Sequence, residues 1–556
     1  MRGATRTIRT GSTSLIRSLR LASRRLVLIC GMMAAGAPAA ATAQPAPGEE
    51  GPARAAAYGV TIADPAPDRS EGQGPFTNLV ITNVMLINGE GAPPMGPVNI
   101  RVSGNRITGI GAGRAVEAAD GVEVLDGSGM YALPGFVDAH AHIGTIGQGL
   151  TGPLTPPEYI FKLWLGHGIT TVRETGAGMG LEWTLAHKAR SEAGEIAAPR
   201  LVVHSMFPGS TVTDPEDARA WVRAVRRKGA DGVKLRGGRG EALKAVMEET
   251  QKLGMGTSHH HDQTAVYQVN ALTSARMGLD SMEHWYGLPE ALFEDRTIQD
   301  YPPDYNYSDE QWRFGQAGRL WQQAAAPDSE HWNAVRDELL ALDFTLVPTF
   351  TIYEANRDVA RARDAEWHRE FTWPGLKRFF MPDPRLHGSY HFDWTTADEV
   401  AWRKNFQLWM QFVNDFKNRG GRVAAGSDAG FIFKLFGFAY IRELEMLQEA
   451  GFHPLEVIQA ATLNGAQLVG LADEIGSLVP GKRADIVLVA ENPVRNFKVL
   501  YGTGHMKLDR EAGQLTRVGG VSYTIRDGIV YDARALLADV KEMVRREAAR
   551  EAAQAQ

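Results

Sequence analysis

Two histidines two positions apart, His140 and His142, are the strongest chemical signal in the sequence. They follow residues 133–137, an apolar run with a Pro-Gly step that is typical of a buried β-strand. Side chains two apart on a strand point to the same face. Two imidazoles are costly to bury there without a ligand, and one metal ion would satisfy both. The pair therefore predicts a metal site at the end of this strand.

Four later segments add groups of the same kind. Lys234 lies within the apolar run 232–235, where an ammonium is unfavourable unless it is neutralised or chemically modified. The alternative is a lysine whose side chain reaches solvent or an acid. An aspartate after Gly-Ser, as at Asp428, ordinarily caps a helix, but here it ends an ordered series. The series is His140, His142, Lys234, one histidine of 259–261, His284 and Asp428.

The composition limits how such a site can be built. The chain has 556 residues, of which 44% are hydrophobic and 22% charged, and a net charge of −6. This is typical of a globular protein, and without a stripe of Lys and Arg we expect no nucleic-acid binding. The single cysteine, Cys30, excludes a disulfide framework, a thiolate zinc site and an iron–sulfur cluster. Any metal must therefore be held by nitrogen and oxygen ligands.

Eight candidate strands alternate with helical stretches and would position these groups. Alternation of this kind favours a parallel sheet, and eight repeats predict a (β/α)8 TIM-like barrel whose catalytic groups lie at the strand C-termini. The stretches near 289–340 and 354–400 exceed ordinary loops, so we expect extra helices and lid segments over the barrel mouth. The candidate strands are 132–137, 169–172, 201–203, 232–235, 255–259, 281–283, 345–348 and 423–425.

Short alternating apolar runs occur on both sides of the barrel region. They are typical of a small β-sheet unit, and one β-sandwich domain built from both ends of the chain accounts for all of them. The predicted α/β organisation is 75–131 for the first part of the sandwich, 132–473 for the barrel, 474–535 for the second part and 536–556 for a C-terminal helix.

The first 43 residues have the pattern of an export signal. They hold seven arginines and no acid, then an apolar stretch at 26–35 and the small residues Ala41-Thr42-Ala43. Ser23-Arg24-Arg25 also fits a twin-arginine signal. The apolar stretch is too short for a good transmembrane helix, so no stable membrane insertion is expected after cleavage. We expect a periplasmic or secreted protein with a flexible lead-in over 44–74.

Several motifs together resemble the amidohydrolase superfamily, in the binuclear branch that includes imidazolonepropionase-like and prolidase-like hydrolases. Besides the metal-ligand series they are Gly-Ile-Thr-Thr-Val-Arg-Glu at 168–174, Ala-Ala-Thr-Leu-Asn-Gly-Ala at 460–466 and the segment 476–486. The resemblance covers about residues 75–535.

The resemblance implies a role for each member of the series. His140 and His142 would bind the more buried of two divalent metal ions, with zinc as the expected metal. Lys234, carboxylated by CO2, would bridge both ions as a carbamate. A histidine of the fifth strand and His284 would bind the second ion. Asp428 would bind the first ion and act as the general base for a metal-activated hydroxide that cleaves a C–N bond of an amide, dipeptide-like or cyclic amide substrate.

The fifth-strand ligand is one of three consecutive histidines. Counting from Gly254 along the family pattern favours His260, while strand alternation puts His259 and His261 on the opposite face. Mononuclear deaminases of the superfamily place a catalytic glutamate two residues after this histidine. The residues around Asp262 do not reproduce that pattern, which puts deamination second.

Three further residues are candidate substrate contacts. Arg236 shares the face of Lys234 and could bind a carboxylate, or pair with an acid at the rim. His204 ends the third strand and could bind a carbonyl, or be a satisfied rim histidine. Tyr286 follows His284 and could wall the pocket, or pack in the core. The expected partner is a small or dipeptide-like substrate, and a homo-oligomer is possible. The alternatives are a deaminase, a lactone or ester hydrolase, and a non-catalytic periplasmic binding protein.

Overall fold

The computed structural model describes residues 50–112, 121–237 and 240–556. The expected leader at 1–43 lies outside these residues. Within the described part, no helix is both long and apolar enough to cross a membrane.

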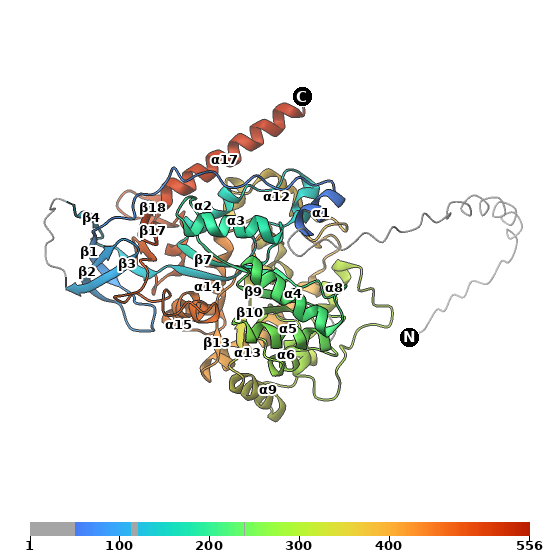
Figure 1. Cartoon of the computed structure of the whole chain (residues 1–556). Helices are drawn as coiled ribbons and strands as arrows, with labels where there is room; N and C mark the ends of the chain where they lie inside the picture. The colour runs from blue at the N-terminus through green and yellow to red at the C-terminus, as the bar shows by residue number, and fades with distance from the viewer. Residues whose placement is uncertain (1–49, 113–120, 238–239) are drawn as a thin grey trace, which may run out of the picture. The chain divides into compact units, whose positions relative to one another are not determined.

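Eight parallel strands form the barrel, in the order β13-β12-β11-β10-β9-β8-β7-β6 (Figure 1). Between the first and last strands, Ala139 N donates to Ala425 O (2.9 Å) and Asp428 N donates to His140 O (2.8 Å), which closes the ring. The predicted barrel is therefore confirmed. Its strands are β6 (Phe136–Ala141), β7 (Ile169–Gly176), β8 (Arg200–Met206), β9 (Gly232–Arg236), β10 (Gly256–His260), β11 (Ser281–Glu283), β12 (Thr345–Val347) and β13 (Arg422–Val423).

The expected first strand, 132–137, is divided between two sheets. Its first half belongs to β5 (Tyr131–Pro134), which pairs with the mixed sheet, and β6 begins only at Phe136. Gly135 lies between them, and a side chain there would overlap Thr170, so the crossing needs glycine. The crossing places His140 within β6 and His142 directly after its last residue.

A mixed sheet of eight strands joins the two ends of the chain. Its order is β18-β17-β14-β5-β1-β2-β3, with β4 paired to β1. β14 from the C-terminal part pairs with β5 from the N-terminal part, as the two-ended β-domain requires. The strands are β1 (Leu79–Leu86), β2 (Met95–Ser103), β3 (Arg106–Ala112), β4 (Glu123–Asp126), β14 (Ile486–Val489), β17 (Val521–Arg526) and β18 (Ile529–Asp532), and a separate hairpin is formed by β15 (His505–Asp509) and β16 (Gln514–Val518).

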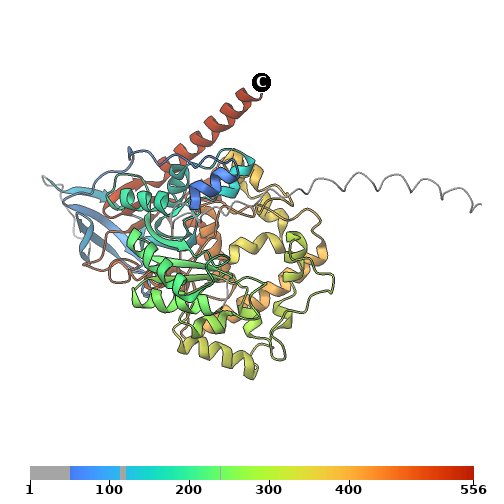
Figure 2. The ribbon, with the colours of Figure 1, turned by 45° about the vertical axis from the view of Figure 1, so that its right-hand side comes forward.

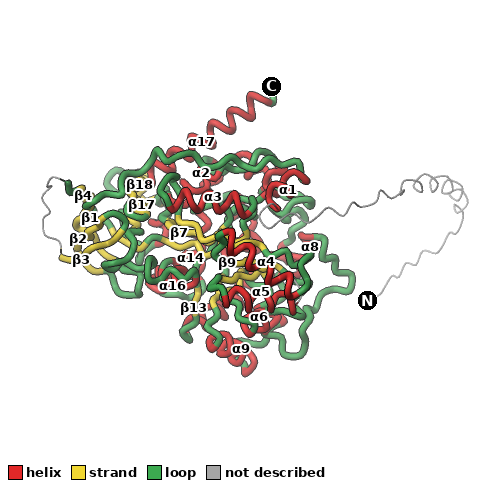
Figure 3. The backbone as a smooth tube through the Cα atoms, viewed as in Figure 1, coloured by secondary structure: helices red, strands yellow, loops and turns green. Residues whose placement is uncertain are grey.

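Helices follow each barrel strand and cover its outer face (Figure 3). Their buried faces are apolar while their outer faces are charged, as a barrel helix requires. They are η1 (Ile146–Thr151), α2 (Pro157–Leu165), α3 (Leu181–Glu192), α4 (Pro215–Lys228), α5 (Gly240–Lys252), α6 (Ala271–Arg276), α14 (Phe438–Glu449), α15 (Pro454–Ala461) and α16 (Leu463–Leu468), and η5 (Phe497–Leu500) and α17 (Ala533–Gln554) follow later.

Two long inserts follow β11 and β12, and both are helical. Figure 2 shows them, yellow-green to orange, beside the green helices of the barrel. Trp321, Trp332, Trp402 and Trp409 are fully buried and hold them together. The insert helices are α7 (Leu288–Ala291), α8 (Glu310–Ala317), η2 (Trp321–Gln323), α9 (Glu330–Ala341), η3 (Phe350–Tyr353), α10 (Glu354–Arg357), α11 (Val359–Arg363), η4 (Glu366–Arg369), α12 (Pro374–Phe379) and α13 (Thr396–Asn418).

The described part of the expected lead-in, residues 50–74, differs from a flexible tether. It begins with helix α1 (Glu50–Ala57) and continues along the outside of the barrel. Ala66 N donates to His187 Nε2 (3.1 Å), and Arg69 N donates to Glu195 O (2.7 Å). These backbone hydrogen bonds, which composition could not reveal, fix the segment to α3 and the loop after it.

Candidate metal centre

His140, His142 and Asp428 meet at the C-terminal end of the barrel. One ligand atom from each lies within 4.8 Å of the others. Oδ1 of Asp428 is 3.2 Å from His142 Nε2 and 3.5 Å from His140 Nε2. His140 lies on β6 and His142 directly after its end, and Asp428 follows β13, the strand beside it. Such a cluster of nitrogen and oxygen donors is suited to a divalent transition metal.

A second pair of imidazoles faces the same carboxylate. His284, directly after β11, has Nε2 3.4 Å from Oδ2 of Asp428. The ring of His260 lies 4.8 Å from that of His284, and both side chains line the cavity above the strand ends. His259 points to the other side of β10, and its two ring nitrogens have no partner in the described part of the chain. His261 also reaches the cavity, but its Nε2 bonds to Ser274 Oγ at 2.9 Å. His260 is therefore the best placed of the three.

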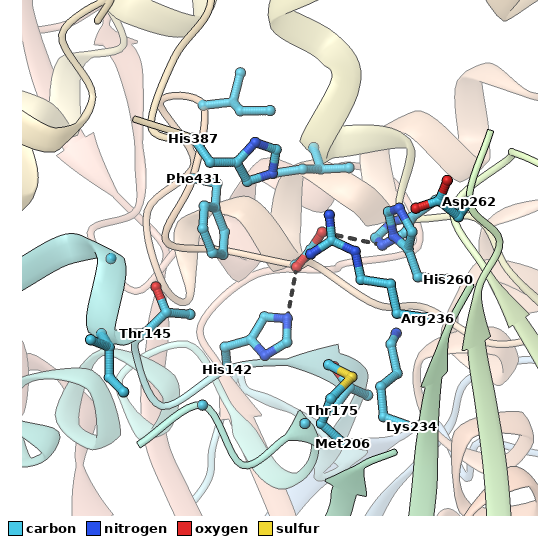
Figure 4. Close-up of a pocket in the computed structure, with 18 of the residues that line it drawn as sticks. His142, Thr145, Thr175, Met206, Lys234, Arg236, His260, Asp262, His387 and Phe431 are labelled. Carbon is cyan, nitrogen blue, oxygen red and sulfur yellow. Dashed lines mark ion pairs between the residues drawn. The ribbon is translucent and has the colours of Figure 1, made fainter. Parts of the chain in front are cut away.

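Lys234 lies between these groups, on β9, with only 3% of its surface exposed. Its Nζ has no hydrogen-bond partner among the described residues. Burial lowers the pKa of this amine to about 8, against the opposing charges of Glu283 and Asp428. Figure 4 shows Lys234, His142 and His260 directed into one space. An orphaned amine among imidazoles and a carboxylate fits a pair of metal ions bridged by a lysine carbamate.

Neighbouring side chains hold the imidazoles in place. His140 Nδ1 bonds to the buried carboxylate of Glu283, whose other oxygen accepts from Arg173 Nη2 at 2.7 Å. His284 Nδ1 bonds to Thr349 Oγ1 at 2.7 Å. In metal sites such partners fix the ring orientation and leave the other nitrogen for the metal. Sequence reasoning missed all three supporting residues, although Glu283 directly precedes a predicted ligand.

The charge balance favours an ionised Asp428. Burial alone would raise the pKa of this carboxyl, but His284 and His142 outweigh it and lower the pKa. For His142, burial lowers the pKa, while the hydrogen bonds that its ring donates to Asp428 and Glu174 raise it to about 9. Without metal, a proton therefore belongs on the imidazole and the carboxylate stays able to accept one.

The site opens into a cavity of about 730 Å³. Arg236 lies exposed on its wall, and Tyr286 lines it with a buried hydroxyl that has no partner among the described residues. His204 does not line it, which corrects the expectation for this residue. It lies one layer lower, next to Gly232, with Nδ1 3.1 Å from Ser258 Oγ. The residue of β8 that pairs with Lys234 is Met206.

The outer part of the cavity is formed by residues that the sequence analysis did not name, most of them within the two predicted lid segments. Glu310 and Arg313 come from α8, and His387 and Phe431 come from loops around the second insert. His387 Nδ1 forms an ion pair with Glu310, which links the two inserts across the cavity. The predicted lid segments therefore contribute directly to the cavity lining.

Comparisons with known proteins show which family the chain is similar to. A family model described as "Amidohydrolase family" matches residues 410–530, which include the strand and loop that carry Asp428. Over these residues the chain is similar to the amidohydrolase family. Solved structures share the fold over most of the chain. A Xaa-Pro dipeptidase with bound methionine is 19% identical, with a TM-score of 0.53, covering 82% of this chain and 100% of its own.

Two further structures have other substrates in their descriptions. A bottromycin amidohydrolase is 19% identical with a TM-score of 0.57, covering 84% of this chain and 91% of its own. A molinate hydrolase is 16% identical with a TM-score of 0.55, covering 84% and 96%. At such identities the likeness shows the fold alone.

Curated relatives match over short segments. An imidazolonepropionase of Geobacillus kaustophilus is 35% identical over 81 residues, which are 15% of this chain and 17% of that protein. An adenine deaminase of Staphylothermus marinus is 36% identical over 97 residues, which are 17% and 15%. The chain thus spans about one sixth of the length of these curated relatives.

Proposed function

We propose that this protein is a metal-dependent hydrolase that cleaves the C–N bond of an amide, dipeptide-like or cyclic amide substrate. The observation that carries the proposal is the single carboxylate of Asp428 within 3.5 Å of three imidazoles, at the base of a cavity of about 730 Å³. The orphaned amine of Lys234 beside it supports two metal ions rather than one.

Six residues would hold the metals. When bound, two divalent ions, zinc in our proposal, polarise a substrate carbonyl and acidify a water molecule. Nitrogen and oxygen donors of this kind suit zinc, and CO2 would convert the Lys234 amine into an anionic oxygen ligand. The set comprises His140, His142, Lys234, His260, His284 and Asp428.

The remaining chemistry is assigned to side chains of the chain itself. Asp428, kept ionised by its imidazole neighbours, accepts a proton from the attacking water and gives it to the leaving amine. The unpartnered hydroxyl of Tyr286 donates a hydrogen bond to the substrate, and Arg236 binds a carboxylate of the substrate. Together they hold the scissile bond against the base.

Two alternatives follow from the same fold. Adenine deaminases are among the relatives, and lactone or ester hydrolysis would use the same groups. A non-catalytic binding protein would have no need for an ionised Asp428 facing three imidazoles.

We also propose that residues 1–43 direct export to the periplasm or beyond, since they carry the pattern of a leader.

The test is a metal count followed by a substrate panel. The chain from residue 44, purified with bicarbonate, should hold about two ions by elemental mass spectrometry. The panel includes dipeptides, N-acyl amino acids, cyclic amides, lactones and adenine, and we expect release of an amine from a member of the first three classes. Ammonia from adenine would support the deaminase instead. A chain that binds no zinc on reconstitution would contradict the proposal.

A further inference from the structure

The segment that follows the expected leader is fixed to the barrel along its whole described length. We call residues 51–74 the strap. Trp183 Nε1 on α3 donates to Ala63 O (3.1 Å), and Arg69 Nε donates to Gly194 O (3.0 Å). Gln73 N then donates to Val530 O (3.0 Å) on β18. The strap, dark blue in Figure 1, thus runs from the mixed sheet across α3 and ends with α1.

The α1 end of the strap lies against the loops that follow β6 and β7. Ala55 is buried in an apolar cluster with Ile146, Leu154 and Met179. Gly51 packs so closely that a side chain there would overlap the Met179 carbonyl oxygen. Gly51 and Arg54 line the same cavity as the candidate metal ligands. The strap therefore forms part of the cavity wall.

The arginines that line the cavity differ in their pairing. Arg313 is paired with Glu310 at 2.7 Å, and Arg385 with Asp383 at 2.9 Å. Arg54 and Arg236 are exposed and have neither an ion pair nor a side-chain hydrogen bond within the described residues. An unpaired guanidinium at the wall of a partly enclosed cavity is a ready partner for a planar carboxylate.

The two unpaired guanidinium groups occupy different sectors of the barrel mouth. Arg236 ends β9, the fourth strand, whereas α1 packs on the loops of the first and second strands. Because neighbouring strands succeed one another around the barrel, a substrate held by Arg236 at one end would extend across the shared cavity toward Arg54.

We propose that Arg54 is a specificity-determining residue, through which the strap selects amide substrates with a second carboxylate, on the end away from Arg236. This inference rests on the proposed function and narrows its substrate class to dianionic N-acyl amino acids and acidic dipeptides. It also gives residues 51–74 a role in substrate binding that a plain linker would not have.

The test uses pairs of substrates that differ by one carboxylate. One pair is N-succinyl-leucine and the same compound with its distal carboxylate as the amide. The other pair is Glu-Leu and Gln-Leu, whose side chains differ on the acyl side of the scissile bond. All four compounds keep the α-carboxylate for Arg236. For at least one pair, we expect Arg54→Ala to lower kcat/KM of the acidic member about tenfold and that of the neutral member less than about twofold.

Two further variants sharpen the result. Arg54→Lys should recover part of the preference, because it restores charge without the planar fork. Arg227→Ala, which removes an exposed arginine on α4 far from the cavity, should change neither member. Equal loss on both members of each pair, or no loss on any, would overturn the role of Arg54.

A separate binding measurement tests Arg54 if the proposed function is wrong. If the wild-type enzyme hydrolyses none of the four compounds, that function is at fault, and binding of the same pairs is measured by calorimetry. The Arg54 proposal still requires the acidic member to bind wild type about tenfold more tightly than Arg54→Ala. Equal affinity for both proteins in both pairs would refute it.

Discussion

The base and the rim of the cavity are built from different parts of the chain. At the base, His140, Lys234 and Asp428 lie at ends of barrel strands and are largely buried. At the rim, Arg54 comes from the strap, and Glu310 and His387 come from the two inserts. Glu310 and His387 form an ion pair with each other. At the base, His140 and His284 are held by the buried side chains of Glu283 and Thr349, whereas at the rim Arg54 has no ion pair among the described residues.

The base also has unusual backbone conformations. His284, Thr349 and Asp428 have φ values of 64°, 47° and 47°, a left-handed region that side chains of this kind rarely adopt. Such strain is maintained only where the surroundings determine the conformation, and it gathers at functional sites. We infer that the base sets the chemistry and the rim sets the choice of substrate, so that variants in the two regions should affect different kinetic constants.

The largest effect is expected at the base, from Asp428→Asn. The amide cannot accept the proton that the mechanism requires, so kcat should fall about 10³-fold, with KM little changed. The fold should persist, because the backbone bond from residue 428 to His140 O remains. Steady-state kinetics on the substrate of the panel that the wild type hydrolyses fastest give kcat and KM. The exposed variant Asp473→Asn serves as the control. Undiminished turnover would remove Asp428 from the mechanism.

The next effect is on metal content, from Lys234→Met. Methionine has a similar length but cannot form a carbamate, so the ion count should fall from about two per chain to about one or fewer, with about a hundredfold loss of kcat. Elemental mass spectrometry with and without bicarbonate gives the count. Lys244→Met, an exposed position on α5, serves as the control. A count that stays at two would mean that the metals need no bridge from this lysine.

A smaller effect is expected where a residue acts through a ligand, as in Glu283→Gln. The amide keeps the size but loses the charge that orients His140, so zinc affinity should weaken about 10-fold to 100-fold. Competition with a chelator measures this affinity, which a purely structural role would leave intact. Glu290→Gln changes an equally buried carboxyl that bonds only to Gly287 N and Gln299, and should leave zinc affinity unaltered. Equal affinities in both variants would contradict the positioning role.

The base of the cavity was the predictable part. His140, Lys234 and Asp428 can be found from the sequence because a polar residue in or after an apolar strand has few explanations in a barrel. Parity along the strand indicates which face a side chain takes, but not its depth. His204 shows this limit, since it has the parity of Lys234 yet pairs with Gly232 and lies below the cavity.

The rim could not be predicted in the same way. Arg54, Glu310 and His387 are far apart in the sequence and lie on segments whose mutual position depends on tertiary packing. The sequence around each of these residues has no periodicity that relates one segment to another. The strap illustrates the point, because its Pro- and Ala-rich composition is typical of a linker, while its backbone hydrogen bonds to α3 and β18 fix it in place.

The smallest effect is expected at the rim, from His387→Ala. This change removes the ion pair that joins the two inserts through Glu310, while Glu310 keeps its bond to Arg313 at 2.7 Å. Exposed ion pairs contribute little to stability, so the melting temperature should move no more than that of the exposed control His453→Ala. KM should rise about twofold to fivefold with kcat unchanged, because looser inserts weaken binding equally in the ground and transition states. A fall in kcat instead would mean that the rim positions the reacting groups, and the division between chemistry at the base and selection at the rim would fail.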